Sequence, residues 1–530
     1  MPNRHYVART ALIVALGGFL MGFDASVISG VVGFIEPRFE LTKLQLGWVV
    51  SSLTLAATLA MMAAGPLSDR IGRRRVLVYA AVLYAVSALA SALAPSFHVL
   101  VMARMIGGLG VGASLIVAPM YIAELSPPRM RGQMVSFNQL NIVLGISAAF
   151  FTNYLILRLG QSGAAWTQTL SLGEEAWRWM LGLEVLPAVI YYFALFAVPE
   201  SPRWLVMRGR EREGLAIMIR ASGEEEAVQQ IADVKESIVT EAREQKPRLV
   251  ELFAPALRTA LLIGVVIGVI QQITGINSVF FYAPMIFEQS GIGTDAAFSQ
   301  AVLVGLVNVV FTVLAMVFID RLGRRPLLIG GLAGISLSMF LLAYGFSTAT
   351  YTLTPASIES LPAVIQSDLR PLEGQTFEDD VAFRRAVDGA LGQDRATLHY
   401  ASLVAGAISM NPRLVLLGVL GFVASFAISI GPVMWVLFSE LFPNWIRGVA
   451  VSFVGFINSA VSFGVQLVFP WELANLGSAT TFLLYGLFGA AGLAFVLKVL
   501  PETKGKSLEE LESMLVTESK SMNPTPRVYP

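Results

Sequence analysis

The chain has 530 residues, of which 55% are hydrophobic and only 14% are charged, whereas a typical soluble domain carries about 25% charged residues. Lys plus Arg and Asp plus Glu balance at 37 each, so no global field indicates nucleic acid as a partner. The chain has no cysteine and only three histidines, none of them mid-span. This excludes disulfides and cysteine metal sites and argues against a histidine relay or metal centre. We therefore expect a membrane protein without a metal or cofactor.

Successive apolar runs are each long enough for a helix of about 20 residues to cross roughly 30 Å of hydrocarbon. The first six lie at residues 9–35, 46–67, 75–95, 97–122, 134–157 and 177–198. The second six lie at residues 257–288, 299–319, 326–347, 413–438, 447–471 and 478–499. The first run is too long for the apolar region of a signal peptide, so we expect it to remain as a spanning helix. Twelve spans without a nucleophile–base or metal constellation exclude a soluble enzyme.

The short connections between these runs differ in their content of Lys and Arg. The connections after the second, fourth and eighth runs carry Arg70, Arg73, Arg74, Arg75, Arg129, Arg131, Arg321, Arg324 and Arg325. The connections after the third and eleventh runs carry neither Lys nor Arg. Because short basic loops stay in the cytoplasm, we expect a multi-pass membrane protein with both termini cytoplasmic.

The two groups of six runs repeat the same motifs, which is typical of transporters built from internal repeats. The paired motifs lie at residues 69–74 and 320–325, at 124–132 and 440–448, and at 199–201 and 501–503. The sequence therefore predicts an all-α membrane protein with two pseudo-symmetric six-helix bundles. The expected parts are a first bundle at 1–205, cytoplasmic amphipathic helices at 206–252, a second bundle at 253–500 and a cytoplasmic tail at 501–530.

The wider spacing of the motifs in the second group places an external insert at residues 349–412, with a helical pattern at 377–392. Inserts of this length are either functional or disordered. Two interpretations stay open, namely a small external cap and a lid or partner-binding module.

One acidic residue, Asp24, interrupts the first apolar run. A charge at that depth costs about 2.5–3.5 kcal/mol on insertion scales, so it indicates a functional site with a partner. The comparable base is Arg104 in the fourth run, which lies at nearly the same depth when both are counted from one face. We expect these two side chains to pair, either as a group that exchanges a proton or as a static lock between the first and fourth helices.

Several motifs, in matching order in both halves, carry a resemblance to a known family. They are Gly-Phe-Asp-Ala-Ser-Val-Ile-Ser-Gly at 22–30, Gly-Pro-Leu-Ser-Asp-Arg at 65–70, Pro-Met-Tyr-Ile-Ala-Glu at 119–124, Pro-Glu-Ser-Pro-Arg-Trp-Leu at 199–205, Gln-Gln-Ile-Thr-Gly-Ile-Asn at 271–277, Asp-Arg-Leu-Gly-Arg-Arg at 320–325 and Pro-Glu-Thr-Lys-Gly at 501–505. The chain resembles the sugar porter branch of the major facilitator superfamily, most of all its bacterial sugar–proton symporters. The resemblance implies the major facilitator fold and a monomer in the bacterial inner (plasma) membrane that imports a hexose, pentose or polyol by alternating access.

The resemblance also assigns roles to single residues. It implies that Asp24 and Arg104 couple protons to transport. It implies substrate contacts for Gln139, Gln271, Gln272, Asn277, Asn308, Asn458, Trp435 and Phe23, and gating by Phe281 and Tyr282. Neutral amides suit sugar hydroxyls because they donate and accept without titrating, although any one of them is also typical of a bond between helices.

Gln271 and Asn277 are six residues apart, so a regular helix would turn them to different faces. Thr274-Gly275 predicts a break that lets both face one cavity. The sequence departs from some bacterial pentose symporters at Ile146, where they have a glutamine, and at Ile430 and Ser459, where they have tryptophan. These departures leave the substrate open and favour a hexose or a polyol.

The charged motifs of the short basic connections predict an ion-pair latch at the inner ends of the bundles. Its expected members are Asp69, Arg73, Arg74, Glu124, Arg131, Glu200, Asp320, Arg324, Arg325, Glu440 and Arg447. The alternative is a set of surface pairs that merely obey the positive-inside rule.

From the sequence we expect a proton-coupled sugar symporter whose partners are a small sugar, protons and the lipid bilayer. Two alternatives stay open, an uncoupled sugar facilitator and a sugar sensor that keeps the transporter fold.

Overall fold

The computed structural model describes residues 4–243, 248–443, 445–504 and 510, without the side chains of 241–243 and 320. In this part of the chain, 12 helical segments are long and apolar enough to cross a membrane. The first six are α1 (Arg4–Arg38), α2 (Lys43–Ile71), α3 (Arg73–Ala92), α4 (Phe97–Leu125), α5 (Pro128–Gln161) and the interrupted segment of α7 (Ala176–Gly182), α8 (Val185–Ala194) and η1 (Leu195–Ala197). We call them the first half. The predicted number of spans is confirmed.

The second half contains the other six segments, and two of them are broken. The seventh span consists of η3 (Pro255–Leu257), α12 (Arg258–Ile273) and α13 (Ile276–Phe281), and the short α14 (Ala283–Glu288) follows it. The remaining spans are α15 (Thr294–Leu322), α16 (Arg324–Ser347), α21 (Pro412–Ile428) with α22 (Ile430–Leu441), α23 (Arg447–Asn475) and α24 (Ser478–Val499). Several helices extend beyond the predicted apolar runs, because polar caps and arginines continue them past the hydrocarbon. Thr42 and Gln45 form a capping box at the start of α2, for example.

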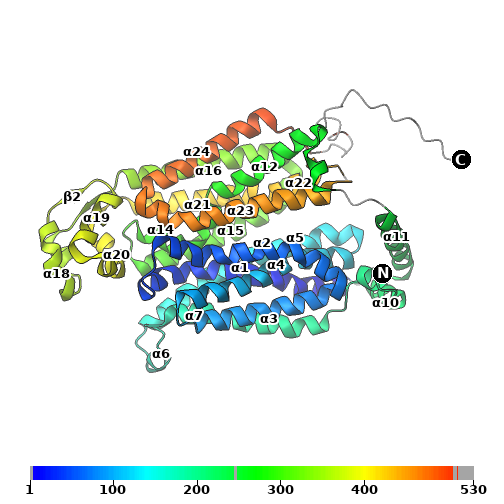
Figure 1. Cartoon of the computed structure of the whole chain (residues 1–530), viewed down its shortest axis with the longest axis horizontal. Coiled ribbons are helices and arrows are strands. Elements are labelled where there is room, and N and C mark those ends of the chain that lie inside the picture. Colours follow the sequence, from blue (N-terminus) through cyan, green and yellow to red (C-terminus); the bar gives the residue numbers. More distant parts are fainter. Residues whose placement is uncertain (1–3, 244–247, 444, 505–509, 511–530) are drawn as a thin grey trace.

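The two halves lie side by side along the long axis (Figure 1). The helices α9 (Pro202–Met207), α10 (Glu211–Ser222) and α11 (Glu224–Arg243) lie at one end, followed by the short η2 (Leu249–Phe253). We call this the basic end, since the arginine-rich connections lie there too. α1 begins there, in contact with α10, and the chain returns there after α24, where Thr503 donates to Glu440. The first and last described segments therefore lie at the same end.

The repeated motifs have a common geometry at the basic end. α2 ends and α3 begins at Gly72, whose φ is 104°, and α15 gives way to α16 at Gly323, whose φ is 94°. Glycine is favoured here because other residues are strained at such angles. Glu200 accepts a bond from the backbone N–H of Arg74 at 3.0 Å, and Glu502 does so from Arg324 at 3.1 Å. In both halves a carboxylate thus binds the N-terminus of a helix, where anions are stabilised.

The opposite end, which we call the insert end, carries α6 (Ala165–Thr169) and the insert between α16 and α21 (Figure 1). The insert comprises β1 (Thr350–Thr352), α17 (Pro355–Glu359), α18 (Ala363–Leu369), η4 (Arg370–Leu372), β2 (Thr376–Phe377), α19 (Asp380–Leu391), α20 (Gln393–Ala407) and β3 (Ile408–Ser409). Its antiparallel strands run in the order β2-β1-β3.

The insert is a folded unit with its own core, in which the rings of Tyr351 and Phe383 stack with centroids 5.2 Å apart. The helix predicted at 377–392 is α19, which starts later because Asp379 caps it by accepting from the N–H of Ala382 at 2.6 Å. Asp380 then accepts from the N–H of Ser478 at 2.9 Å, which docks the insert on α24. The structure therefore has a packed cap at this end of the molecule.

Candidate functional site

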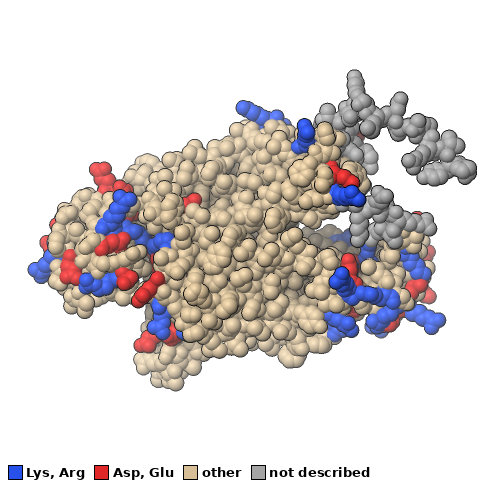
Figure 2. Space-filling view, viewed as in Figure 1, with Lys and Arg blue, Asp and Glu red and all other residues tan. Residues whose placement is uncertain are grey.

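A cavity of about 740 Å³ lies between the two halves. The cavity opens toward the basic end, where two of its lining residues are exposed, Met62 on α2 by 66% and Phe456 on α23 by 45%. Figure 2 shows a hollow between the two halves near this end. Toward the insert end the two halves meet. There the ring of Trp48 on α2 packs edge-on against the ring of Phe463 on α23, with their centroids 5.6 Å apart. The cavity is therefore open at the basic end and closed at the insert end.

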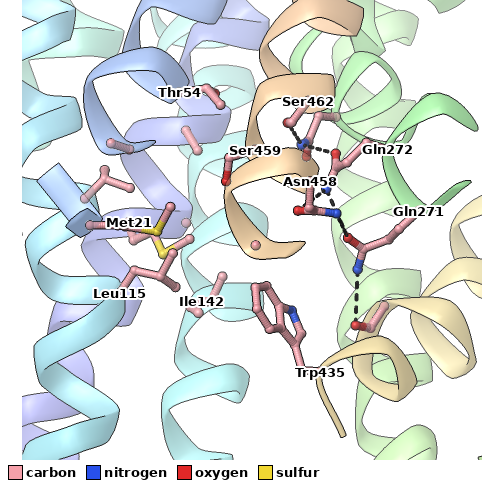
Figure 3. Close-up of a pocket in the computed structure, with 18 of the residues that line it drawn as sticks. Met21, Thr54, Leu115, Ile142, Gln271, Gln272, Trp435, Asn458, Ser459 and Ser462 are labelled. Carbon is pink, nitrogen blue, oxygen red and sulfur yellow. Dashed lines mark hydrogen bonds between the residues drawn. The ribbon is translucent and has the colours of Figure 1, made fainter. Parts of the chain in front are cut away.

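The second half lines this cavity with a cluster of side-chain amides (Figure 3). Asn458 on α23 donates to Gln271 Oε1 on α12 at 2.7 Å, and Gln272 donates to Asn458 Oδ1 at 3.3 Å. Asn277 on α13 donates to Ser462 Oγ at 2.7 Å. Each amide still has donor or acceptor capacity left, because an amide can make four hydrogen bonds. We call these four amides, together with the hydroxyl group of Ser462, the amide cluster.

The backbone breaks in the second half hold the amide cluster in place. α12 ends at Ile273 and α13 begins at Ile276, and Gly275 between them adopts the left-handed conformation with φ of 90°. This break lies at the predicted Thr274-Gly275 position and turns Gln271 and Asn277 to one cavity. A second break, at Ser429, separates α21 from α22, and the carbonyl of Gly431 in the first turn of α22 accepts from Gln271 at 3.4 Å.

The first half forms the opposite wall, and it is mainly apolar. Met21 on α1, Leu115 on α4 and Ile142 on α5 face the amide cluster across the cavity (Figure 3). Ile146 lines the same wall one turn along α5. Gln139 is the one side-chain amide that this half contributes to the cavity, within the described residues.

Most of the residues predicted to touch a substrate line the cavity. They are Gln139, Gln271, Gln272, Asn277, Asn308, Asn458 and Trp435, together with the predicted gate residue Phe281.

The structure places two predicted residues away from the cavity. Phe23 is 3% exposed and stacks on Phe19 with ring centroids 6.2 Å apart. α1 instead turns Met21 and Ala25 to the cavity, since residues four apart share a helix face. Tyr282 is also buried, and its hydroxyl donates to the carbonyl of Gln466 at 3.1 Å, so it braces α23 rather than lining the cavity.

Behind the apolar wall, Asp24 and Arg104 form a buried ion pair, and each is 1% exposed. The same Arg104 nitrogen donates to the backbone carbonyl of Asp24 at 2.9 Å. Ala25 and Ser26, next to Asp24, line the cavity. The pair that the matching depths predict is therefore present, one layer away from the cavity.

A third charged residue, Glu184, belongs to this cluster. It lies at the break between α7 and α8, is 2% exposed and is close enough to interact electrostatically with Asp24 and Arg104. Glu184 Oε1, Asp24 Oδ2 and Arg104 Nε have no hydrogen-bond partner among the described residues. Glu184 is not among the residues predicted from the sequence, although it is an acidic residue within an apolar run, which is the same signal that identified Asp24.

At the basic end the two halves contain an arginine–glutamate pair in equivalent positions. Arg73 donates to both carboxylate oxygens of Glu124 at 3.1 Å and also pairs with Asp69 at 2.9 Å. In the second half Arg324 pairs with Glu440 at 2.9 Å. Both pairs join helices of one half, and among the described residues no ion pair at this end bridges the two halves.

Four other predicted latch residues bind differently than expected. Arg131 donates to the carbonyl of Ala123 at 3.1 Å and Arg447 to that of Phe442 at 3.2 Å, so neither pairs with its expected carboxylate. The guanidinium groups of Arg74 and Arg325 likewise donate to backbone carbonyls. These arginines close helix ends, where carbonyls lack helical partners. The side chain of Asp320 lies outside the described residues.

Comparisons with known proteins agree with this geometry. The family model described as "Sugar (and other) transporter" matches residues 10–363 and 390–515. The arabinose-proton symporter of Bacillus subtilis is 33% identical over 96% of this chain and 95% of its own. The D-xylose-proton symporter of Escherichia coli K12 is 33% identical over 99% of this chain and 98% of its own. The inward open conformation of the xylose transporter XylE from E. coli superposes with a TM-score of 0.73 at 31% identity, covering 96% of this chain and 100% of that one.

Proposed function

Because this chain belongs to the sugar transporter family, we propose that it is a proton-coupled monosaccharide symporter that imports its sugar by alternating access. The family consists of transporters, so the chain is not an enzyme. The observation that carries the proposal is the combination of a buried, incompletely bonded Asp24–Arg104 pair with a neutral amide cluster across one cavity. A proton and a sugar need these two different kinds of site.

We assign the basic end to the cytoplasm and the insert end to the outside, since short arginine-rich connections stay inside and long inserts cross regardless of charge. The structure is then the inward-facing state, with its cavity open to the cytoplasm. A monomer in the inner membrane of a bacterium is the simplest assembly, because each chain contains a complete cavity.

The amide cluster binds the sugar. Its side chains donate and accept at once, as hydroxyl groups require, and they keep this capacity at any physiological pH. Trp435, which is 47% exposed in the cavity, covers an apolar face of the ring. The breaks at Gly275 and Ser429 let these side chains follow the sugar as the halves rock.

Asp24 binds the proton. When it is protonated its attraction to Arg104 weakens, and the Arg104 guanidinium then has Glu184 as the remaining carboxylate in range. This exchange of partners changes how α1, α4 and α8 pack, which favours the reorientation of the loaded carrier. The pairs Arg73–Glu124 and Arg324–Glu440 hold the inner ends of each half together as the halves move.

Asp24→Asn tests the proposal, with purified protein in proteoliposomes that carry a proton gradient. We expect uphill sugar accumulation to be abolished, because the amide cannot release a proton, while sugar exchange at equilibrium continues. The matched control is Asp295→Asn, which neutralises an exposed carboxylate at the insert end and should leave accumulation unchanged. Full accumulation by the Asp24 variant would contradict the proposal.

Proton flux in the unmodified protein separates the alternatives. We expect sugar addition to alkalinise the outside medium. Sugar flux without alkalinisation would identify an uncoupled facilitator, and sugar binding without flux would identify a sensor.

A further inference from the structure

The two walls of the cavity offer a sugar very different surroundings. The second half presents the amide cluster, Asn308 and Ser459. Across from the amide cluster, the first half presents Met21, Leu115 and Ile142 (Figure 3), and Ile146 lines the same cavity one turn further along α5. A ligand held by the amide cluster therefore turns its other edge toward hydrocarbon.

The hydroxyl groups of the first half do not change this. Thr54 donates across the interface to Gln466 at 2.9 Å, and Thr58 donates to the carbonyl of Thr54 at 2.8 Å. Ser26 borders the cavity, but its hydroxyl oxygen is buried. Gln139 alone presents a polar side chain there without a hydrogen bond among the described residues. Gln139 can bond the hydroxyl groups within its reach, but the apolar side chains that make up the rest of this wall can bond none.

We propose that the preferred cargo is a 6-deoxyhexose, a monosaccharide whose exocyclic carbon is a methyl group that packs on the apolar wall of Met21, Leu115, Ile142 and Ile146. This inference rests on the proposed sugar symport and names the substrate class. The ring hydroxyls bind the amide cluster, and the methyl group contacts the wall when the halves close. A hexose with a 6-hydroxyl would lose a hydrogen bond to water there without replacement.

The expected difference in affinity between sugars with and without a 6-hydroxyl group is moderate and measurable. An apolar pocket rejects a ligand that merely adds a hydroxyl group by about a hundredfold at most. Part of the apolar wall is exposed to the open cavity. We therefore expect the 6-deoxy sugar to bind about tenfold to hundredfold more tightly than the hexose with a 6-hydroxyl group. Ile146 is the sharpest position to test, since glutamine there would supply both a donor and an acceptor for the 6-hydroxyl.

The experiment measures binding of matched sugar pairs to the purified full-length protein by isothermal titration. The pairs are D-galactose with D-fucose, and D-glucose with 6-deoxy-D-glucose. We expect the deoxy sugar to bind at least about tenfold more tightly in one pair or both. Ile146→Gln should reduce that ratio to about one, and Met21→Gln, a second variant on the same wall, should reduce it in the same direction.

The matched control is Val451→Gln, which places the same side chain in the cavity wall toward the basic end. It should leave the ratio unchanged. Equal or tighter binding of the parent hexoses, with binding clearly detected, would overturn the 6-deoxyhexose inference and leave the symporter proposal standing. Absence of binding by all four sugars, together with absence of sugar uptake, would overturn both.

Discussion

The two halves repeat one plan at the basic end but differ at mid-depth. In the first half, α1 and α4 bury the charges of Asp24 and Arg104 behind an apolar wall. In the second half, the broken spans expose neutral amides to the cavity. A proton site has to titrate, whereas a sugar site works best when it does not. Under the proposed function, each task therefore belongs to its own half, and the cavity links the two.

The largest expected effect concerns the charged half. Arg104→Met should lower the free energy of unfolding by about 3–5 kcal/mol, because it leaves a buried carboxylate without its partner. Adding Asp24→Asn should restore most of this loss. Thermal unfolding of the purified variants measures both. A double variant no more stable than the single one would show that the pair is not the main source of the effect.

The next effect tests Glu288, a partly buried carboxylate at the end of α14, beyond the seventh span. Glu288 borders a small cavity with Lys43, Arg384 and Tyr400, and burial raises its pKa from 4.5 to about 7, against the opposing bond from Thr294. A raised carboxyl pKa stabilises the folded state below the unfolded pKa, and this contribution is lost as pH rises through about 7. It amounts to about 3 kcal/mol.

Glu288→Gln should remove this loss of stability between about pH 4.5 and 7, as unfolding at a series of pH values would show. Uphill sugar accumulation at constant pH should persist in this variant, unlike in Asp24→Asn. Loss of accumulation would mean that the second half also handles the transported proton.

The amide half is tested by comparing Gln271→Ala with Gln139→Ala. Gln271 accepts from Asn458 and from Gln272, so its removal leaves buried donors unpaired and should weaken sugar binding by about 10- to 100-fold. Gln139 makes no side-chain bond among the described residues, and its removal should cost less than about tenfold. Titration calorimetry with one sugar ranks the two. The reverse order would contradict the assignment of the sugar to the second half.

The smallest effect compares the two pairs at the basic end. The Arg73 side chain is 3% exposed, whereas that of Arg324 is 14% exposed. Arg73→Gln should therefore destabilise the protein by about 2 kcal/mol and Arg324→Gln by about 1 kcal/mol, since exposed pairs contribute less. Equal losses of stability in the two variants would indicate that the different burial of the two arginines does not affect how much each pair stabilises its half.

Much of this organisation could be predicted from the sequence. The spans follow from apolar runs that must be about as long as the bilayer is thick, and the helix break follows from Thr274-Gly275. The Asp24–Arg104 pair follows from depth alone, because a buried charge needs a partner at its own level. These are properties of single segments, and they do not depend on how the helices rotate.

Other features depended on rotation and on the choice of partner. The depth of Phe23 is suitable for a substrate contact, yet the turn of α1 buries it and faces Met21 to the cavity. Arg131 and Arg447 have carboxylates nearby in the sequence, yet they bind backbone carbonyls. Packing decides such details, because neighbouring positions on a helix differ by about 100° in direction.

The sequence by itself determined the number of spans, the repeat, the folded insert's position and the residue types available for a proton and a sugar, since hydropathy and buried charge act locally. Only the tertiary structure decided that the charges lie behind an apolar wall, that Glu184 joins them and that the amides meet in one cluster. Those outcomes require helices far apart in the chain to pack with a particular rotation, and the free energy that selects it comes from contacts between them.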